Sequence, residues 1–244
     1  MPAWLVPFIP EPALAARLFP ASVAYAIGAA ALASYLRVGR GLRTGYTRKS
    51  FHFLIFSAAG AVQLRWGLQG VVVLGTVTSA MVLFAVWRGD GFPFYEAMAR
   101  PSDAPRRSLF ILVPLVTTAL GGVVSNLAFP AWAFVGYLVC GWGDAAGEPA
   151  GTRWGRHRYR VPSMGGVPST RSLEGSAAVF TAGTLATAIA LLASGAPLAA
   201  ASAISIGAGL AGALVEAIST HGLDNFTVQV AASAAAHVIA RSVL

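Results

Sequence analysis

Two carboxylates four residues apart, Asp144 and Glu148, are the side chains whose spacing most directly predicts chemistry in this sequence. On a helix they lie one turn apart on the same face, where their charges repel each other. Ionised groups within apolar segments are costly and are by default candidates for a functional site. A Mg²⁺ ion would offset the repulsion, because it binds one or two carboxylates together with phosphate oxygens and water. Salt bridges to Arg153 or Arg156 are the structural alternative.

The polar segment that follows this pair is rich in groups that bind phosphate. Arginine side chains match phosphate oxygens through paired hydrogen bonds, and donors at a helix N-terminus form an anion site. Glu174 begins the next apolar segment, where attraction to the helix dipole is its structural explanation. The candidates for phosphate binding here are Arg153, Arg156, Arg171 and Ser172.

Further polar groups stand at the ends of other apolar segments. Glu216 ends an otherwise neutral segment without an evident structural reason, whereas Asp224, followed by Asn225, could cap the last segment. Lys49 and His52 begin another segment and share a face if that segment is helical. We therefore interpret these groups as candidates for the second half of one site.

The elements that must position these residues are membrane helices. The chain has 244 residues, of which 56% are apolar and only 11% charged, against about 25% charged in soluble domains. At about 20 residues per span, the length allows roughly eight spans. We predict an all-α membrane bundle, formed by a single domain over residues 21–244 after a proline-rich lead-in over residues 1–20. The expected spans are residues 21–36, 51–64, 68–87, 109–128, 131–151, 173–193, 198–218 and 225–244, with a break at residues 65–67.

The distribution of basic residues predicts the orientation of these spans. The segments 37–50, 88–107 and 152–171 carry 14 of the 17 Lys and Arg residues. Basic residues accumulate on cytoplasmic loops, so these segments, together with 219–224, face the cytoplasm and both termini face outward. This alternation of the spans brings the polar groups to the cytoplasmic face of the membrane. We expect that membrane to be the cell (inner) membrane. They are His52, Asp144, Glu148, Glu174, Glu216, Asp224 and Asn225.

Several classes of function are disfavoured. The net charge is +8, but the sequence has no basic domain and no aromatic platform for bases outside the spans. Nucleic acid is therefore not an expected partner, and the charge is explained by the orientation of the spans. No G-x-x-x-x-G-K-[ST] loop, protein-kinase signature or G-x-S-x-G elbow is present. The single cysteine, Cys140, excludes an internal disulfide and is expected to pack in a helix.

Four motifs, in order along the chain, resemble those of the integral-membrane polyprenol kinase family, which includes phytol kinase, dolichol kinase and CTP-dependent diacylglycerol kinases. The family patterns are RK-x-x-H, GD-x-x-A/G-x-x-x-G-x-x-x-G, K-S-x-x-GS and E-x-x-…-D-N-x-x-V. Their counterparts here are RKSFH (48–52), GDAAGEPAGTRWG (143–155), RSLEGS (171–176) and VEAISTHGLDNFTV (215–228).

The resemblance implies transfer of a phosphoryl group from a nucleoside triphosphate, typically CTP, to the hydroxyl of a membrane lipid alcohol. Asp144 would then coordinate Mg²⁺ and phosphate, with Glu148 and Glu174 as supporting acids. Arg171 stands where the family usually has lysine. The other implied site residues are Asp224 and Asn225 beside the nucleotide or metal, Glu216 near the hydroxyl, and Lys49 and His52 near the phosphates or lipid headgroup.

Two alternatives compete with this interpretation. A CDP-lipid synthase would catalyse a related reaction, but the His-Gly-Gly and paired aspartates that such enzymes carry near the C-terminus are absent from this sequence. A solute transporter would need polar residues near mid-bilayer and inverted repeats, whereas the acids here gather at one face. The identity of the alcohol, the choice between CTP and ATP, and assembly into homo-oligomers are left open.

Overall fold

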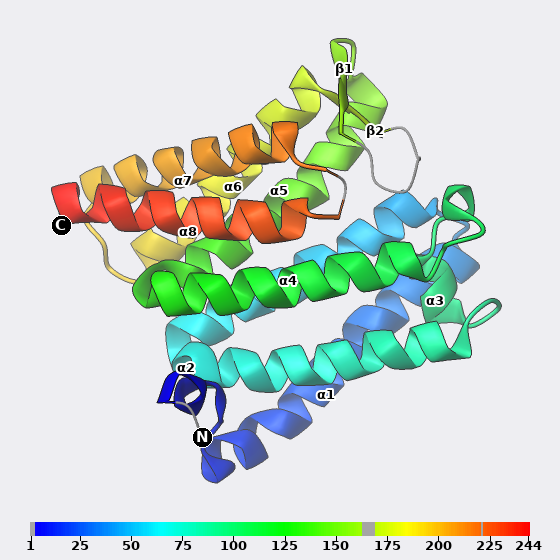
Figure 1. Cartoon of the computed structure of the whole chain (residues 1–244), viewed down its shortest axis with the longest axis horizontal. Coiled ribbons are helices and arrows are strands. Elements are labelled where there is room, and N and C mark those ends of the chain that lie inside the picture. The colour runs from blue at the N-terminus through cyan, green and yellow to red at the C-terminus, as the bar shows by residue number, and fades with distance from the viewer. Residues whose placement is uncertain (1–2, 163–168, 221) are drawn as a thin grey trace. The chain divides into compact units, whose positions relative to one another are not determined.

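The computed structural model describes residues 3–162, 169–220 and 222–244, so His221 of the last motif lies outside the described residues. The fold is all-α, as predicted, with one additional two-stranded sheet. The chain divides into two compact units, Met1–Leu112 and Val113–Leu244 (Figure 1).

In the first unit, helix begins earlier than the sequence predicts. A 3-10 turn over Ala3–Phe8 is followed by α1 (Pro12–Ser34), which continues through Pro20 and ends in a π-helical turn over Tyr35–Gly39. The proline-rich lead-in expected over residues 1–20 is therefore helical from residue 12. Proline at the first helical positions loses no hydrogen bond, because the N–H groups there have no partner within the helix.

The next element, α2 (Thr44–Arg88), contains the break expected at residues 65–67. Gly67 has φ 64° and ψ −159°, which interrupts the helix. A positive φ carries little steric penalty only for glycine, so the break falls on this residue. The helical part before the break starts at Thr44, which places Lys49 and His52 in its first turns.

The polar segment after α2 is more ordered than the loop that was expected. It contains α3 (Pro93–Met98) and a 3-10 turn over Pro101–Asp103. Arg107 holds it together, with ion pairs to Asp90 at 2.5 Å and Glu96 at 2.7 Å. The hydrogen bond from Arg107 is the largest cause of a lowered pKa at Glu96.

Three of the following helices have the bounds that the sequence predicts: α4 (Leu109–Ala128), α6 (Leu173–Ala193) and α7 (Leu198–Ile218). The first four residues of α4 belong to the first unit, and the rest of α4 belongs to the second unit with α6 and α7. A 3-10 turn over Pro130–Trp132 leads into α5 (Ala133–Trp154), and α8 (Asp224–Val243) closes the chain. α5 packs against α6 and α8, and α7 lies between α6 and α8 (Figure 1).

In the described part of the expected polar loop over residues 152–171, which omits residues 163–168, most residues belong to helix or strand. α5 extends to Trp154, and β1 (Arg158–Val161) pairs antiparallel with β2 (Ser169–Ser172). The register places Tyr159 opposite Arg171 and Arg158 opposite Ser172. The alternation Arg-Tyr-Arg-Val has the period of a strand, but its arginines hide the apolar signal.

Within the described residues, five helical segments are long and apolar enough to cross a membrane. They are Pro12–Gly39, Thr44–Arg88, Leu109–Ala128, Leu173–Ala193 and Leu198–Ile218. α5 and α8 are not among them, in keeping with the polar residues that both helices carry. The count of eight spans and the outward termini stay predictions.

Small residues allow the helices of the second unit to pack closely. A Cβ atom added to Gly136 of α5 would lie 2.5 Å from both the Gln229 backbone oxygen and the Ser233 Oγ of α8. A Cβ atom at Gly147 would lie 2.5 Å from Val179 Cγ2 of α6. Such contacts bring backbones together without large side chains between them.

We expect Gly136→Ala to lower the free energy of unfolding by about 1–3 kcal/mol, because backbone and side-chain atoms of α8 would have to move. Unfolding in detergent micelles, followed by circular dichroism, measures the change. Gly75→Ala is the control, since nothing lies within 4 Å of its added Cβ atom. A Gly136→Ala protein as stable as wild type would contradict this packing.

Candidate active site

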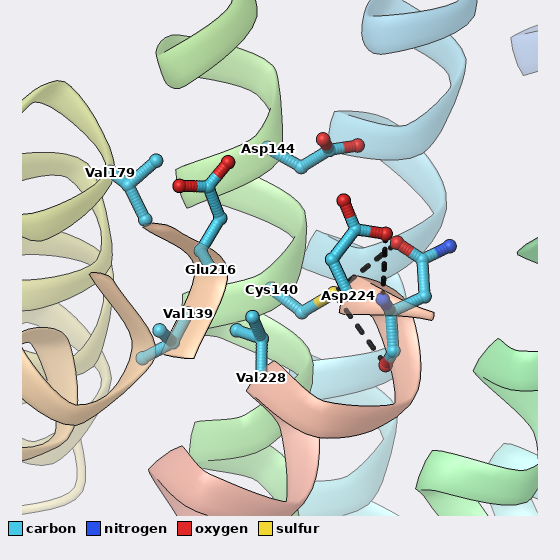
Figure 2. Close-up of a pocket in the computed structure, with 8 residues that line it drawn as sticks. Val139, Cys140, Asp144, Val179, Glu216, Asp224 and Val228 are labelled. Atoms are coloured by element: carbon cyan, nitrogen blue, oxygen red, sulfur yellow. Dashed lines mark hydrogen bonds between the residues drawn. The ribbon is translucent and has the colours of Figure 1, made fainter. Parts of the chain in front are cut away.

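A small pocket lies where α5, α6, α7 and α8 meet (Figure 2). Three of its side chains are carboxylates from three different helices: Asp144 of α5, Glu216 of α7 and Asp224 of α8. The remaining lining residues are Asn225 and the less polar Val139, Cys140, Val179 and Val228. The structure therefore brings together four of the residues selected from the sequence, which are up to 81 positions apart (144 to 225).

Asp144 lies at the pocket because the glycines near it on α5 let this helix approach its neighbour closely. Gly143 and Gly147 both pack against Val179, so α5 and α6 approach closely at this level. One turn earlier on α5, Cys140 is buried, with its Sγ 3.9 Å from the Asn225 backbone oxygen and 3.9 Å from its Oδ1 (Figure 2). Cys140 is thus the packing residue that was expected, and it also lines the pocket.

Arg171 on β2 joins the two other carboxylates of the pocket. Its guanidinium forms ion pairs with Glu216 and, at 2.9 Å, with Asp224, and it donates to the Ser219 backbone oxygen at 3.3 Å. The exposed fractions of the Arg171, Glu216 and Asp224 side chains are 15%, 16% and 14%. Such burial is tolerable for three charges only while they remain paired. This arrangement gives Glu216 the structural reason that its sequence context lacks.

Asp224 and Asn225 also have structural tasks. Asp224 Oδ1 accepts hydrogen bonds from the backbone N–H groups of Gly222, at 3.1 Å, and Asn225, at 3.0 Å, at the start of α8. Asn225 is 4% exposed, and its side-chain amide donates to Thr118 Oγ1 of α4 at 2.9 Å. Both residues therefore fix the N-terminus of α8 beside the pocket.

The other predicted site residues on and next to the hairpin, apart from Arg171, do not line this pocket. Glu174 lies 2.8 Å from His157 Nδ1 and accepts from the His157 backbone N–H at 3.3 Å. Ser172 caps α6 by accepting the Gly175 N–H at 3.1 Å. Arg153 and Arg156 are exposed.

The predicted metal ligands do not form a three-residue cluster. In the part of the chain that the structure describes, no group of three or more His, Cys, Asp or Glu side chains is placed to hold a metal ion. Asp144 lines the pocket, Glu148 follows one turn later on α5, and Glu174 pairs with His157. Because Mg²⁺ needs only one or two carboxylates when phosphate supplies other ligands, Asp144 fits this role, which stays a prediction.

Lys49 and His52 belong to the first unit. Lys49 is 6% exposed, and the ring of His52 lies 5.7 Å from that of Phe56 one turn later on α2. Their participation in the site stays a prediction.

The fold and this pocket define a multi-pass helical membrane protein whose acidic site is held by an arginine. No family model matches the chain, and no solved structure matches it. The chain is 30% identical, over 185 residues, to the phytol kinase of Synechocystis sp.; the match covers 75% of this chain and 74% of that protein. The chain therefore belongs to the polyprenol kinase family, which confirms the resemblance carried by its four motifs.

We expect Arg171→Met to lower the free energy of unfolding by about 3 kcal/mol, because it leaves two largely buried carboxylates without their shared cation. The triple variant Arg171→Met, Glu216→Gln, Asp224→Asn removes all three charges and should regain most of that loss. Denaturant unfolding in detergent compares the two variants. A triple variant no more stable than the single one would show that the buried charges are not the cause.

Proposed function

We propose that this protein is a membrane lipid kinase that transfers the terminal phosphoryl group of a nucleoside triphosphate to the hydroxyl of an isoprenoid alcohol such as phytol or a polyprenol. The donor that we propose is CTP. The observation that carries the proposal is the pocket in which Asp144 faces the Arg171-bridged pair Glu216 and Asp224, in a chain of the polyprenol kinase family. Diacylglycerol is the other acceptor class that the motifs allow.

Phosphoryl transfer requires mainly positioning and neutralisation of charge. The acceptor hydroxyl oxygen forms a bond to the terminal phosphorus, the bond from that phosphorus to the bridging oxygen breaks, and the nucleoside diphosphate leaves. Glu216, whose carboxylate lines the pocket, is the candidate to receive the hydroxyl proton. Asp144, supported by Glu148, would hold Mg²⁺, which supplies positive charge to the phosphates when bound.

The other side of the pocket suits a lipid acceptor. Val139, Val179 and Val228 line it from α5, α6 and α8, so apolar surface lies directly next to the carboxylates. A lipid alcohol combines one polar group with an apolar chain, and this pairing of surfaces matches it. Access to both a cytoplasmic nucleotide and a membrane lipid would follow from a site at the cytoplasmic face, as the distribution of basic residues predicts.

We expect Asp144→Asn to lower phosphorylation of lipid alcohols at least 100-fold, because a neutral amide binds Mg²⁺ much more weakly than a carboxylate does. The assay uses purified protein in micelles with Mg-CTP and a panel of phytol, a polyprenol and diacylglycerol. Asp90→Asn is the matched control, since the Asp90 side chain is 77% exposed and lies outside the pocket. Wild-type activity in Asp144→Asn, at unchanged thermal stability, would contradict the mechanism.

The reaction products separate this proposal from its alternatives. We expect CTP to support faster transfer than ATP, with release of CDP and appearance of the terminal phosphate on the lipid. A CDP-lipid synthase would instead release pyrophosphate and leave CMP on the lipid. Labelling CTP at the α and γ positions in parallel distinguishes the two outcomes. Solute uptake into vesicles without any nucleotide would favour a transporter instead.

A further inference from the structure

The β1–β2 hairpin has two faces with different tasks. Side chains alternate across a strand, so Tyr159 and its partner Arg171 share one face. That face is turned toward the helices, because the Tyr159 hydroxyl lies 3.0 Å from Ser176 Oγ and Arg171 pairs with the pocket acids. Arg158 and Arg160 belong to the opposite face, and both are exposed.

The start of α6 fixes the level of this outer face relative to the membrane. α6 has 21 residues and is one of the helices suited to crossing the membrane. At about 1.5 Å per residue it is about 31 Å long, which matches a hydrocarbon core of about 30 Å. If α6 spans this core, its first residue, Leu173, lies at the edge of the core.

The strand register then places the two arginines in the headgroup layer. Arg158 is opposite Ser172, the residue just before α6, and Arg160 is opposite Thr170. Thr170 is three residues before Leu173, so along the strand the backbones of both arginines lie within about 10 Å of the start of α6, which is about one Debye length at 0.1 M salt. Attraction to anionic lipid is effective over this range.

Neighbouring side chains fit the same environment. Trp154 at the end of α5 is 62% exposed and Leu173 is 60% exposed, which suits contact with lipid at the interface. The segment from Arg153 to Pro162 contains no acidic residue that could neutralise the arginines. The Arg158 Nε atom donates to the Gly155 backbone oxygen at 3.1 Å, which fixes the base of the hairpin.

We propose that Arg158 and Arg160, on the outer face of the hairpin, bind the headgroups of anionic phospholipids in the leaflet from which α6 starts. These two arginines take no part in the acidic pocket, because strand alternation directs Arg171 toward it and directs them away. The hairpin thus joins the pocket to the membrane surface, with one arginine facing inward and two facing the lipid headgroups.

Lipid binding by the full chain in neutral detergent tests the proposal. Native mass spectrometry and thermal unfolding are measured while phosphatidylglycerol, phosphatidylcholine or inorganic phosphate is added. We expect wild type to bind phosphatidylglycerol in preference to the other two. Arg158→Gln with Arg160→Gln should weaken that binding about 25-fold, since each arginine near an anionic surface contributes about fivefold.

Two further variants separate charge from folding. Arg158→Lys with Arg160→Lys keeps both charges and should retain most of the binding. Arg17→Gln with Arg241→Gln removes two exposed arginines from α1 and α8 and should leave it unchanged. Equal binding by the glutamine variant and wild type, or an equal loss in the Arg17 and Arg241 variant, would overturn the proposal. Saturation by phosphate alone would show a site for a soluble anion and would overturn it as well.

Discussion

The bridge from Arg171 to Glu216 and Asp224 is the interaction on which the second unit depends. It joins β2, the end of α7 and the start of α8 through one largely buried guanidinium. Two carboxylates with so little contact with water would repel each other without a cation between them. The bridge therefore holds three chain segments together and also defines the acidic side of the pocket.

Close packing of α5 brings Asp144 to the same place. Glycines on either side of Asp144 let α5 approach α6, and Gly136 lets it approach α8. With larger residues at these positions the helices would move apart and the three carboxylates would no longer line one pocket. Stability and chemistry are thus coupled here, because the same small residues serve both.

The hairpin is the element that connects this pocket with its surroundings. Strand alternation separates its arginines, so that Arg171 faces the acids while Arg158 and Arg160 face outward. Glu174 and Ser172 hold the base of the hairpin and cap α6. Their selection from the sequence as site residues stays a prediction. A phosphoryl-transfer site beside a membrane needs this kind of order, because it must keep a charged nucleotide and an apolar acceptor adjacent.

By itself, the sequence determined the all-α class, the bounds of α4, α6 and α7, the break at Gly67 and the family, because long apolar runs and motif spacing are local properties. It also singled out Asp144, Glu216 and Asp224, because a charge at the edge of an apolar segment is costly wherever the chain folds. Only the tertiary structure decided which charges pair. Arg171 and Asp224 are 53 residues apart, and nothing in either local sequence specifies the other. The sequence did not predict the hairpin, because the arginines of β1 mask its alternation of polar and apolar residues. It did not predict the early start of α1 either, because the prolines there disfavour helix in the sequence.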